Sequence, residues 1–192
     1  MDATADALRR GRRLEVATLA WNVAGLGVLG VAAVRAGSVA LGGFGLDSLI
    51  EIGASTVVLW ELADAHEQRR RRALRLIGWA FVALAAYLAV QSSVLLAAGD
   101  QPAPSYLGIG WTAVTALVMF SLARGKAVAG RALDNPVLLT EGRVTTVDGI
   151  LATAVLAGLA LNAGVGWWWA DPAAAYVLVF YGAREARATL SS

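Results

Sequence analysis

Three acidic residues lie inside long apolar stretches of the sequence, at spacings that suit a shared site. Asp47 and Glu51 are four residues apart, so a helix places both carboxylates on one face. Asp148 lies at a comparable depth in another apolar stretch. An ionisable group at the centre of a bilayer costs about 3 kcal/mol on insertion scales. Each of the three acids is therefore a candidate for function.

Three carboxylates that meet between two helices need a compensating charge. Mutual repulsion and loss of hydration disfavour three negative charges in a low dielectric unless protons or a cation are bound. Carboxylate oxygens suit divalent cations, and exchange of a cation for protons neutralises the cluster in both states. We therefore expect Asp47, Glu51 and Asp148 to bind a divalent cation and protons in turn. The alternative is a structural role, in which these acids only bond neighbouring helices.

Three further polar residues are candidates for accessory or entry positions. Glu141 precedes Asp148 by seven residues, which is two helical turns on the same face, so it is expected as an entry step for the cation. Glu15 and Asn22 are also seven residues apart, in the first apolar stretch. Asn22 is expected either to donate an oxygen ligand or to form a hydrogen bond between helices.

The remaining polar residues narrow the chemistry. Arg143 is expected to reach the membrane surface or to pair with Glu141 or Glu61, and no other Arg or Lys is expected as an intramembrane counter-ion. His66 is the only histidine, and we expect it to be a solvated loop residue. The chain has no cysteine, so disulfides, thiolate sites and cysteine nucleophiles are excluded.

Six apolar stretches must position these residues. The chain has 192 residues, of which 58% are hydrophobic and 16% charged, with a mean hydropathy of +0.62. A membrane-spanning helix needs roughly 20 mainly apolar residues. The sequence predicts an all-α integral membrane protein with a six-helix transmembrane domain at 14–188, an N-terminal segment at 1–13 and a tail at 189–192, without a cleaved signal peptide or a soluble domain. The expected helices are 14–36, 39–65, 74–98, 106–130, 137–163 and 171–188.

Basic residues set the expected orientation, because Arg and Lys near helix ends stay on the cytoplasmic side. Four basic groups fall on one side of a six-helix topology, which predicts that both termini are cytoplasmic and that the protein is a multi-pass protein of the cell (plasma or inner) membrane. These groups are Arg9 to Arg13, Arg69 to Arg75, the set Arg124, Lys126 and Arg131, and the pair Arg184 and Arg187. We expect the lipid bilayer, and no nucleic acid, as the partner of this basic surface.

Two local patterns predict helix packing and helix starts. Gly42, Gly43, Gly45 and Gly53 surround the acids of the second stretch and predict close approach of neighbouring helices. Asp171 and Pro172 predict an N-cap followed by proline at the first position of the last helix. Trp167 to Trp169 are expected at the membrane interface.

These motifs together resemble the cation diffusion facilitator (cation efflux) transporters, over essentially the whole chain. The family's S-x-A-L segment matches Ser38 to Leu41, followed by Asp47 and Glu51. The family's helix 5 pair, typically His and Asp, falls on Val144 and Asp148, and its Trp-Trp-x-Asp start of helix 6 matches Trp168 to Asp171. The sequence is most similar to short, transmembrane-only members with G-F-G-L-D-S-L-I-E on helix 2.

The resemblance implies export of a divalent cation from the cytoplasm in exchange for protons, by alternating access. It carries over Asp47, Glu51 and Asp148 as ligands, whereas Val144 cannot coordinate a cation, which leaves water, Glu141 or Thr145 to complete the shell. An all-oxygen site is more typical of manganese or magnesium than of zinc, and zinc, iron and cobalt stay open. The chain stops at Ser192 without the family's C-terminal cytoplasmic domain, so a homodimer is expected to form through membrane helices.

Three other classes stay open on the sequence alone. A cation or proton channel would line a pore with the same acids, and a non-transporting membrane scaffold would keep them protonated and structural. A membrane-embedded hydrolase ranks last, because paired acids alone supply no positioned nucleophile.

Overall fold

The structure is a computed structural model that describes residues 2–61, 67–134 and 136–190. Over these residues the chain forms six α-helices and no strand, as expected. The helices are α1 (Asp2–Ala36), α2 (Val39–Glu61), α3 (Glu67–Ala98), α4 (Tyr106–Leu133), α5 (Pro136–Val165) and α6 (Ala170–Leu190).

The predicted helix bounds agree with these to within a few residues, except at the starts of α1 and α3. Helix α1 begins at Asp2 instead of residue 14, and α3 begins at Glu67 instead of residue 74. Both extensions are rich in Arg, which is a strong helix former, so the helix continues beyond the apolar stretch. The segment expected to precede the first helix is therefore helical from residue 2.

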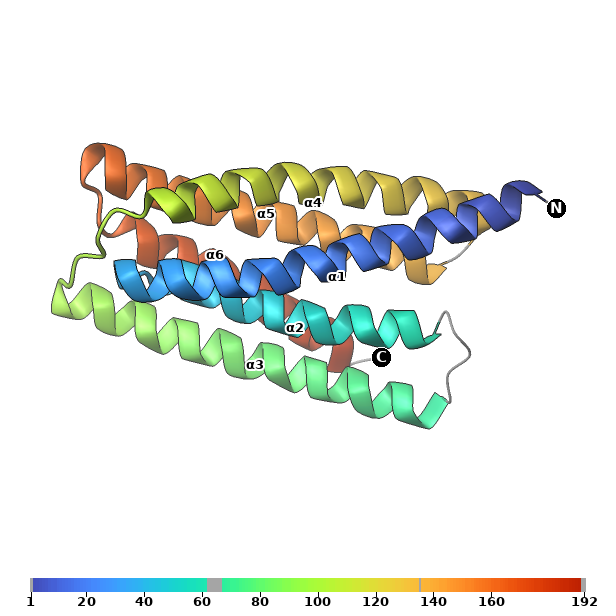
Figure 1. Ribbon diagram of the computed structural model, residues 1–192. Helices are drawn as coiled ribbons and strands as arrows, with labels where there is room; N and C mark the ends of the chain where they lie inside the picture. The colour runs from blue at the N-terminus through green and yellow to red at the C-terminus, as the bar shows by residue number, and fades with distance from the viewer. Residues whose placement is uncertain (1, 62–66, 135, 191–192) are drawn as a thin grey trace.

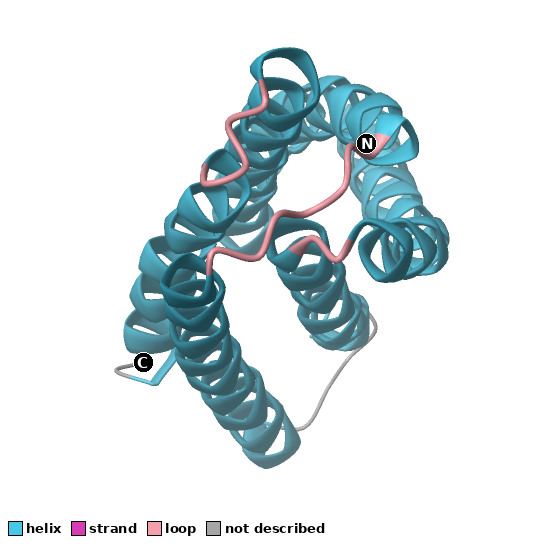
Figure 2. Cartoon of the chain, turned by 90° about the vertical axis from the view of Figure 1, so that its left-hand side faces the viewer, coloured by secondary structure: helices cyan, strands magenta, loops and turns pink. Residues whose placement is uncertain are grey.

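The helices run up and down in one elongated bundle (Figure 1). Helices α1, α3 and α5 start towards the right-hand side of that view, and α2, α4 and α6 return to it. Figure 2 shows the three described connections, α1–α2, α3–α4 and α5–α6, at the opposite end. Helix α2 contacts α1, α3, α5 and α6, so the helix that carries Asp47 and Glu51 is surrounded by other helices.

Glycines end the three helices that reach the loop end of the bundle. Gly37, Gly99 and Gly166 follow α1, α3 and α5 with φ of 63°, 71° and 69°, a left-handed conformation that glycine adopts without steric cost. The loop between α3 and α4 is held by hydrogen bonds to the end of α1 and to α5. The amide of Ala103 donates to the carbonyl of Ala36 (2.8 Å), and Asn162 Nδ2 donates to the carbonyl of Pro102 (2.8 Å).

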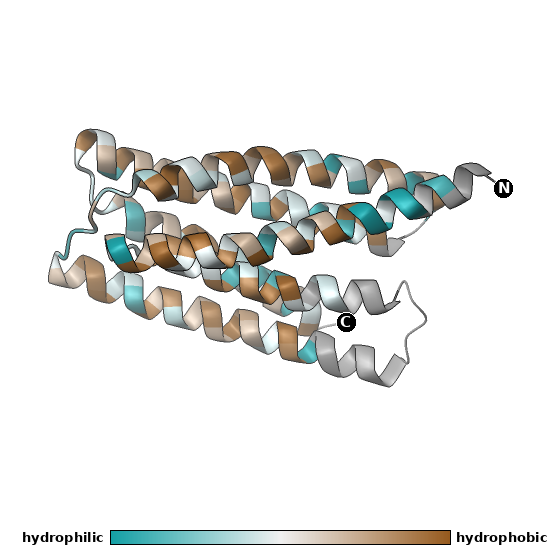
Figure 3. Ribbon diagram, viewed as in Figure 1, coloured by the Kyte–Doolittle hydropathy of each residue, from teal (hydrophilic) through white to brown (hydrophobic). Residues whose placement is uncertain are grey.

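Four helices are long and apolar enough to cross a membrane, as judged over the residues that the structure describes. They lie at Arg9–Ala36, Arg75–Ala98, Tyr106–Leu133 and Leu138–Val165. Only 28–44% of the residues in their most apolar windows are buried, and large apolar residues such as Val31, Leu76 and Leu117 are exposed. Figure 3 shows apolar residues (brown) along these helices. An outward-facing apolar surface of this extent is a property of membrane proteins.

The start of α6 is bonded to the start of α2. Asp171 is fully buried and accepts hydrogen bonds from the side chain of Ser38 and from the amides of Val39 (3.1 Å) and Ala40 (3.3 Å). Ser38 Oγ in turn accepts from the amide of Leu41 (3.0 Å). Asp171 was predicted to cap its own helix, and this is wrong. Helix α6 begins one residue earlier, and the carboxylate instead satisfies free amides at the N-terminus of α2.

Among the four glycines near the acids of α2, Gly43 allows the closest approach of a neighbouring helix. A Cβ on Gly43 would lie 2.7 Å from Leu88 of α3, whereas one on Gly53 would meet nothing within 4 Å. On α5, two glycines allow the backbone of a neighbouring helix to approach closely. A Cβ on Gly158 would lie 2.7 Å from the carbonyl oxygen of Ala170, and one on Gly142 would lie 3.3 Å from the carbonyl oxygen of Ala123.

Candidate ion site

The buried polar side chains follow the inner faces of the helices. On α1 the residues at 11, 15, 18, 22, 25 and 29 are buried at alternating spacings of three and four, which is the period of one helix face. Glu15, Thr18 and Asn22 belong to that face. The same spacing on α5 buries Glu141, Thr145 and Asp148. Helix packing therefore directs these six polar residues of α1 and α5 into the bundle and away from its outer surface.

Asp47 and Glu51 of α2 and Asp148 of α5, here called the acid trio, are buried inside the bundle. Their exposed fractions are 5%, 4% and 6%. Helices α2 and α5 are in contact. The charge of Glu51 interacts with those of Asp148 and Asp47, and the charge of Asp148 interacts with that of Asp47. The three carboxylates therefore lie within electrostatic range of one another.

One oxygen of the acid trio lacks a hydrogen-bond partner. Asp148 Oδ2 is buried and unpartnered, a costly arrangement for a carboxylate oxygen away from water. Over the described residues, no group of three or more His, Asp or Glu side chains is arranged to hold a metal ion. The convergence of the acid trio on one ion stays a prediction.

Lys126, which was expected in a basic group on the cytoplasmic side, is buried inside the bundle. Lys126 of α4 has no exposed surface, and its ammonium donates to Glu15 Oε2 (3.1 Å), Glu141 Oε2 (3.4 Å) and Thr145 Oγ1 (3.0 Å). The hydroxyl of Thr145 donates to the carbonyl of Glu141 (2.9 Å), so its oxygen is free to accept from the ammonium. All three donors of the lysine are thus satisfied.

Two expectations are corrected by this group of four residues, here called the Lys126 cluster. Lys126 is not part of the surface basic set, because it is a buried counter-ion inside the bundle. Arg143 was expected to reach the membrane surface or to pair with Glu141 or Glu61; it is exposed, and Glu141 pairs with Lys126. The side chain of Glu61, the other expected partner of Arg143, lies outside the described residues, as does His66.

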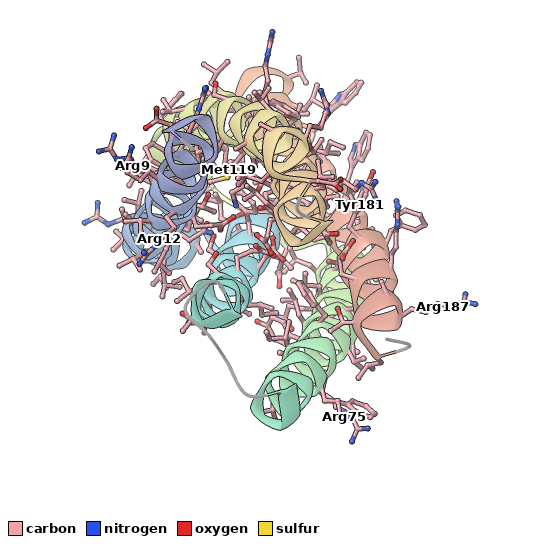
Figure 4. The ribbon with its side chains drawn as sticks, turned by 90° about the vertical axis from the view of Figure 1, so that its right-hand side faces the viewer. Arg9, Arg12, Arg75, Met119, Tyr181 and Arg187 are labelled. Carbon is pink, nitrogen blue, oxygen red and sulfur yellow. The ribbon has the colours of Figure 1, made fainter. Side chains whose placement is uncertain are left out.

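A periodic signal in α4 would have located Lys126. The buried residues Thr112, Thr115, Met119, Ala123 and Lys126 recur every three or four positions, and Figure 4 shows Met119 directed into the bundle. Arg124 and Arg131 fall off this face and are exposed. Lys126 is close in sequence to Arg124 and Arg131, which suggested a surface position, whereas its helical position predicts that it is buried.

Two of the predicted accessory residues, Glu15 and Asn22, each keep one buried polar atom without a partner. Glu15 Oε1 and Asn22 Nδ2 are both buried without a hydrogen-bond partner, so Asn22 does not form the expected interhelical bond through its Nδ2. Val144 is half-buried and supplies no ligand atom. Sequence reasoning also missed Glu185 of α6, a partly buried acid whose charge interacts with that of Asp47.

The buried charges of the bundle are strongly unbalanced. Among the described residues, the buried charged side chains are six acids and one base. They are Glu15, Asp47, Glu51, Glu141, Asp148, Asp171 and Lys126. Asp171 is served by three donors at the start of α2, and Lys126 bonds Glu15 and Glu141. Among the side chains that the structure describes, no buried base bonds the acid trio.

The outer rim of the bundle is basic at the end where α1 begins. Figure 4 shows Arg9, Arg12, Arg75 and Arg187 pointing away from the helices around that rim, while side-chain oxygens gather inside the ring of helices. Exposed basic side chains and buried acidic side chains are thus separated between the rim and the interior.

Comparisons with known proteins do not identify the chain. No model of a known protein family matches it, and no curated protein gives a significant match.

Proposed function

We propose that this protein is a multi-pass membrane transporter that exchanges a divalent metal cation for protons at the acid trio. The observation that carries the proposal is the unpartnered buried oxygen of Asp148, which lies within electrostatic range of Glu51 and Asp47. A cation or a proton would satisfy that oxygen. Because the three carboxylates do not form a ligand group in the structure, metal binding requires them to draw closer together.

Charge balance connects the metal with the protons. Three ionised carboxylates in a low dielectric are unfavourable, so the trio is expected to hold protons when no metal is bound. A divalent cation that enters the trio displaces protons from the carboxylates it binds. If the cation and the protons leave towards opposite sides of the membrane, the result is antiport by alternating access.

The topology that serves this function has six spans. Helix α2 carries its acids towards other helices and contacts four of them, so it can cross a bilayer with its charges hidden from lipid. The charged residues of α6 lie mostly in its last two turns, where they would reach the interface. The basic rim then lies in the cytoplasm together with both termini, and the protein belongs to the cell membrane.

The resemblance to the cation diffusion facilitator family supplies the direction of transport, which is export from the cytoplasm, and the expectation of a homodimer formed by membrane helices. The bond between Ser38 and Asp171 supports the resemblance, because it joins the two motifs, S-x-A-L and Trp-Trp-x-Asp, on which the likeness partly rests. Glu141 and Thr145 are both bonded to Lys126, which favours water as the ligand that replaces the family histidine at Val144. Manganese, iron, cobalt and zinc are the candidate substrates.

Metal binding to the purified protein tests the proposal separately from transport. Titration calorimetry with Mn, Fe, Co and Zn ions in detergent is expected to show binding to the native chain, with release of protons to the buffer, and none to Asp148→Asn. A folded protein that binds none of these metals would favour the scaffold. Metal flux that persists without counter-movement of protons would favour the channel.

A further inference from the structure

The Lys126 cluster has the composition of a cation site that is already filled by the protein itself. Two carboxylates and a hydroxyl, from α1 and α5, surround one ammonium from α4. Carboxylate and hydroxyl oxygens are the ligand types that bind hard divalent cations. An ammonium held by such oxygens occupies the position that a metal ion would take.

One carboxylate oxygen of the Lys126 cluster, Glu15 Oε1, has no hydrogen-bond partner. Glu15 has no exposed surface, and its Oε1 has no hydrogen-bond partner, although its other oxygen binds Lys126. A lysine ammonium offers three hydrogen-bond donors, and all three are used by Glu15 Oε2, Glu141 and Thr145. The group therefore contains more acceptors than its resident cation can serve.

The cluster also lies between the acid trio and the basic end of the bundle. Lys126 is seven residues before the end of α4, and Glu141 is five residues after the start of α5. Asp148 follows Glu141 by two helical turns, about 10 Å along the axis. The charges of Lys126 and Glu141 both act on Glu51 and Asp148. A cation that approached the trio from the basic end would meet the Lys126 cluster first.

We propose that Glu15, Glu141 and Thr145 form a second cation site, on the approach to the acid trio, and that the ammonium of Lys126 is its resident occupant. While the ammonium stays, it joins α1, α4 and α5 and closes the approach. When it leaves Glu141, the site accepts an incoming divalent cation and the approach opens. The inference rests on the proposed function for the identity of the incoming ion, but the closure by Lys126 is testable without any metal.

The absence of native cysteines allows closure to be measured with one introduced thiol. Ser48 is 5% exposed and lies between Asp47 and Glu51 in the sequence of α2. In a Ser48→Cys background, Lys126→Met is expected to raise the rate of labelling by a water-soluble thiol reagent by about tenfold, because charge-assisted hydrogen bonds are lost. Arg124→Met, which removes an exposed charge from the same helix, is the matched control and should leave the rate unchanged.

A milder variant keeps the test decisive if Lys126→Met fails to fold. Glu141→Gln keeps the shape of the side chain and the pair of Lys126 with Glu15, and it weakens one of the three bonds of the ammonium. It is expected to raise the labelling rate by a smaller factor. Unchanged labelling in either folded variant would overturn the closure by Lys126.

Calorimetry with Mn²⁺ tests the second site itself. The native protein is expected to bind one ion per chain at the acid trio, and Lys126→Met is expected to bind a second, which Glu15→Gln in the same background should remove. If Lys126→Met binds one ion only, the second site is wrong while the proposed function stands. If the native protein binds none, the proposed function fails, and faster labelling alone would then support closure by Lys126.

Discussion

Lys126 and Glu15 form an ion pair of 3.1 Å between two side chains without exposed surface. They belong to α4 and α1, which are in contact, and the same ammonium reaches Glu141 of α5. A buried ion pair is stable only when both charges are well bonded, and this lysine uses all of its donors. Of the six buried acids among the described residues, two therefore share this base, Asp171 is bonded at the start of α2, and the acid trio has neither arrangement.

The acid trio is expected to be required for metal binding but not for folding. Asp47→Asn, Glu51→Gln and Asp148→Asn each remove a charge while preserving shape, and each relieves repulsion among buried carboxylates. We expect metal affinity to fall by more than about 100-fold, since loss of an outer-shell partner alone costs up to that factor. Titration calorimetry measures the affinity, and size-exclusion chromatography in detergent monitors folding.

A matched control for these variants is Asp134→Asn. Asp134 is exposed and ends α4 with a φ of 47°, a conformation that asparagine also adopts readily. The metal affinity of Asp134→Asn should equal that of the native chain. Native affinity in Asp148→Asn would show that the acid trio is not the site.

Asp171 is expected to be a structural residue. Asp171→Ala leaves the hydroxyl of Ser38 and two amides of α2 without their acceptor, which should lower the free energy of unfolding by about 2 kcal/mol. Unfolding in mixed micelles with increasing SDS measures the change. Ser93→Ala, which removes an exposed hydroxyl that bonds Tyr176, should cost less than about 1 kcal/mol. An equal cost for the two variants would contradict the capping role.

Gly158 is expected to set the distance between α5 and α6. A methyl group there would lie 2.7 Å from the carbonyl oxygen of Ala170 and 2.8 Å from Cβ of Ala174, so Gly158→Ala must push the helices apart and should cost about 1–3 kcal/mol. On the same helix, Gly164→Ala meets nothing within 4 Å and should change stability by less than about 0.5 kcal/mol. The same SDS titration compares them, and equal stabilities would argue against tight α5–α6 packing.

Residue patterns along single helices predicted much of this architecture, whereas contacts between helices were harder to foresee. The long apolar stretches sufficed for the six helices, and the four-residue spacing of Asp47 and Glu51 sufficed for their shared buried face. Asp171 was assigned to its own helix because local capping rules cannot show that α2 begins beside it. Lys126 was misplaced because charge clustering outweighed helical period. Its partner Glu15 lies 111 residues away, and no local pattern links such residues.

Transport by the reconstituted protein tests the central claim most directly. Uptake of Mn, Fe, Co, Zn and Cd ions into proteoliposomes is measured under an imposed pH gradient, for the native chain and for Asp148→Asn. We predict uptake that depends on the gradient in the native protein and is lost in the variant. Uptake of no ion by folded native protein, or equal uptake by both proteins, would contradict proton-coupled metal transport at the acid trio.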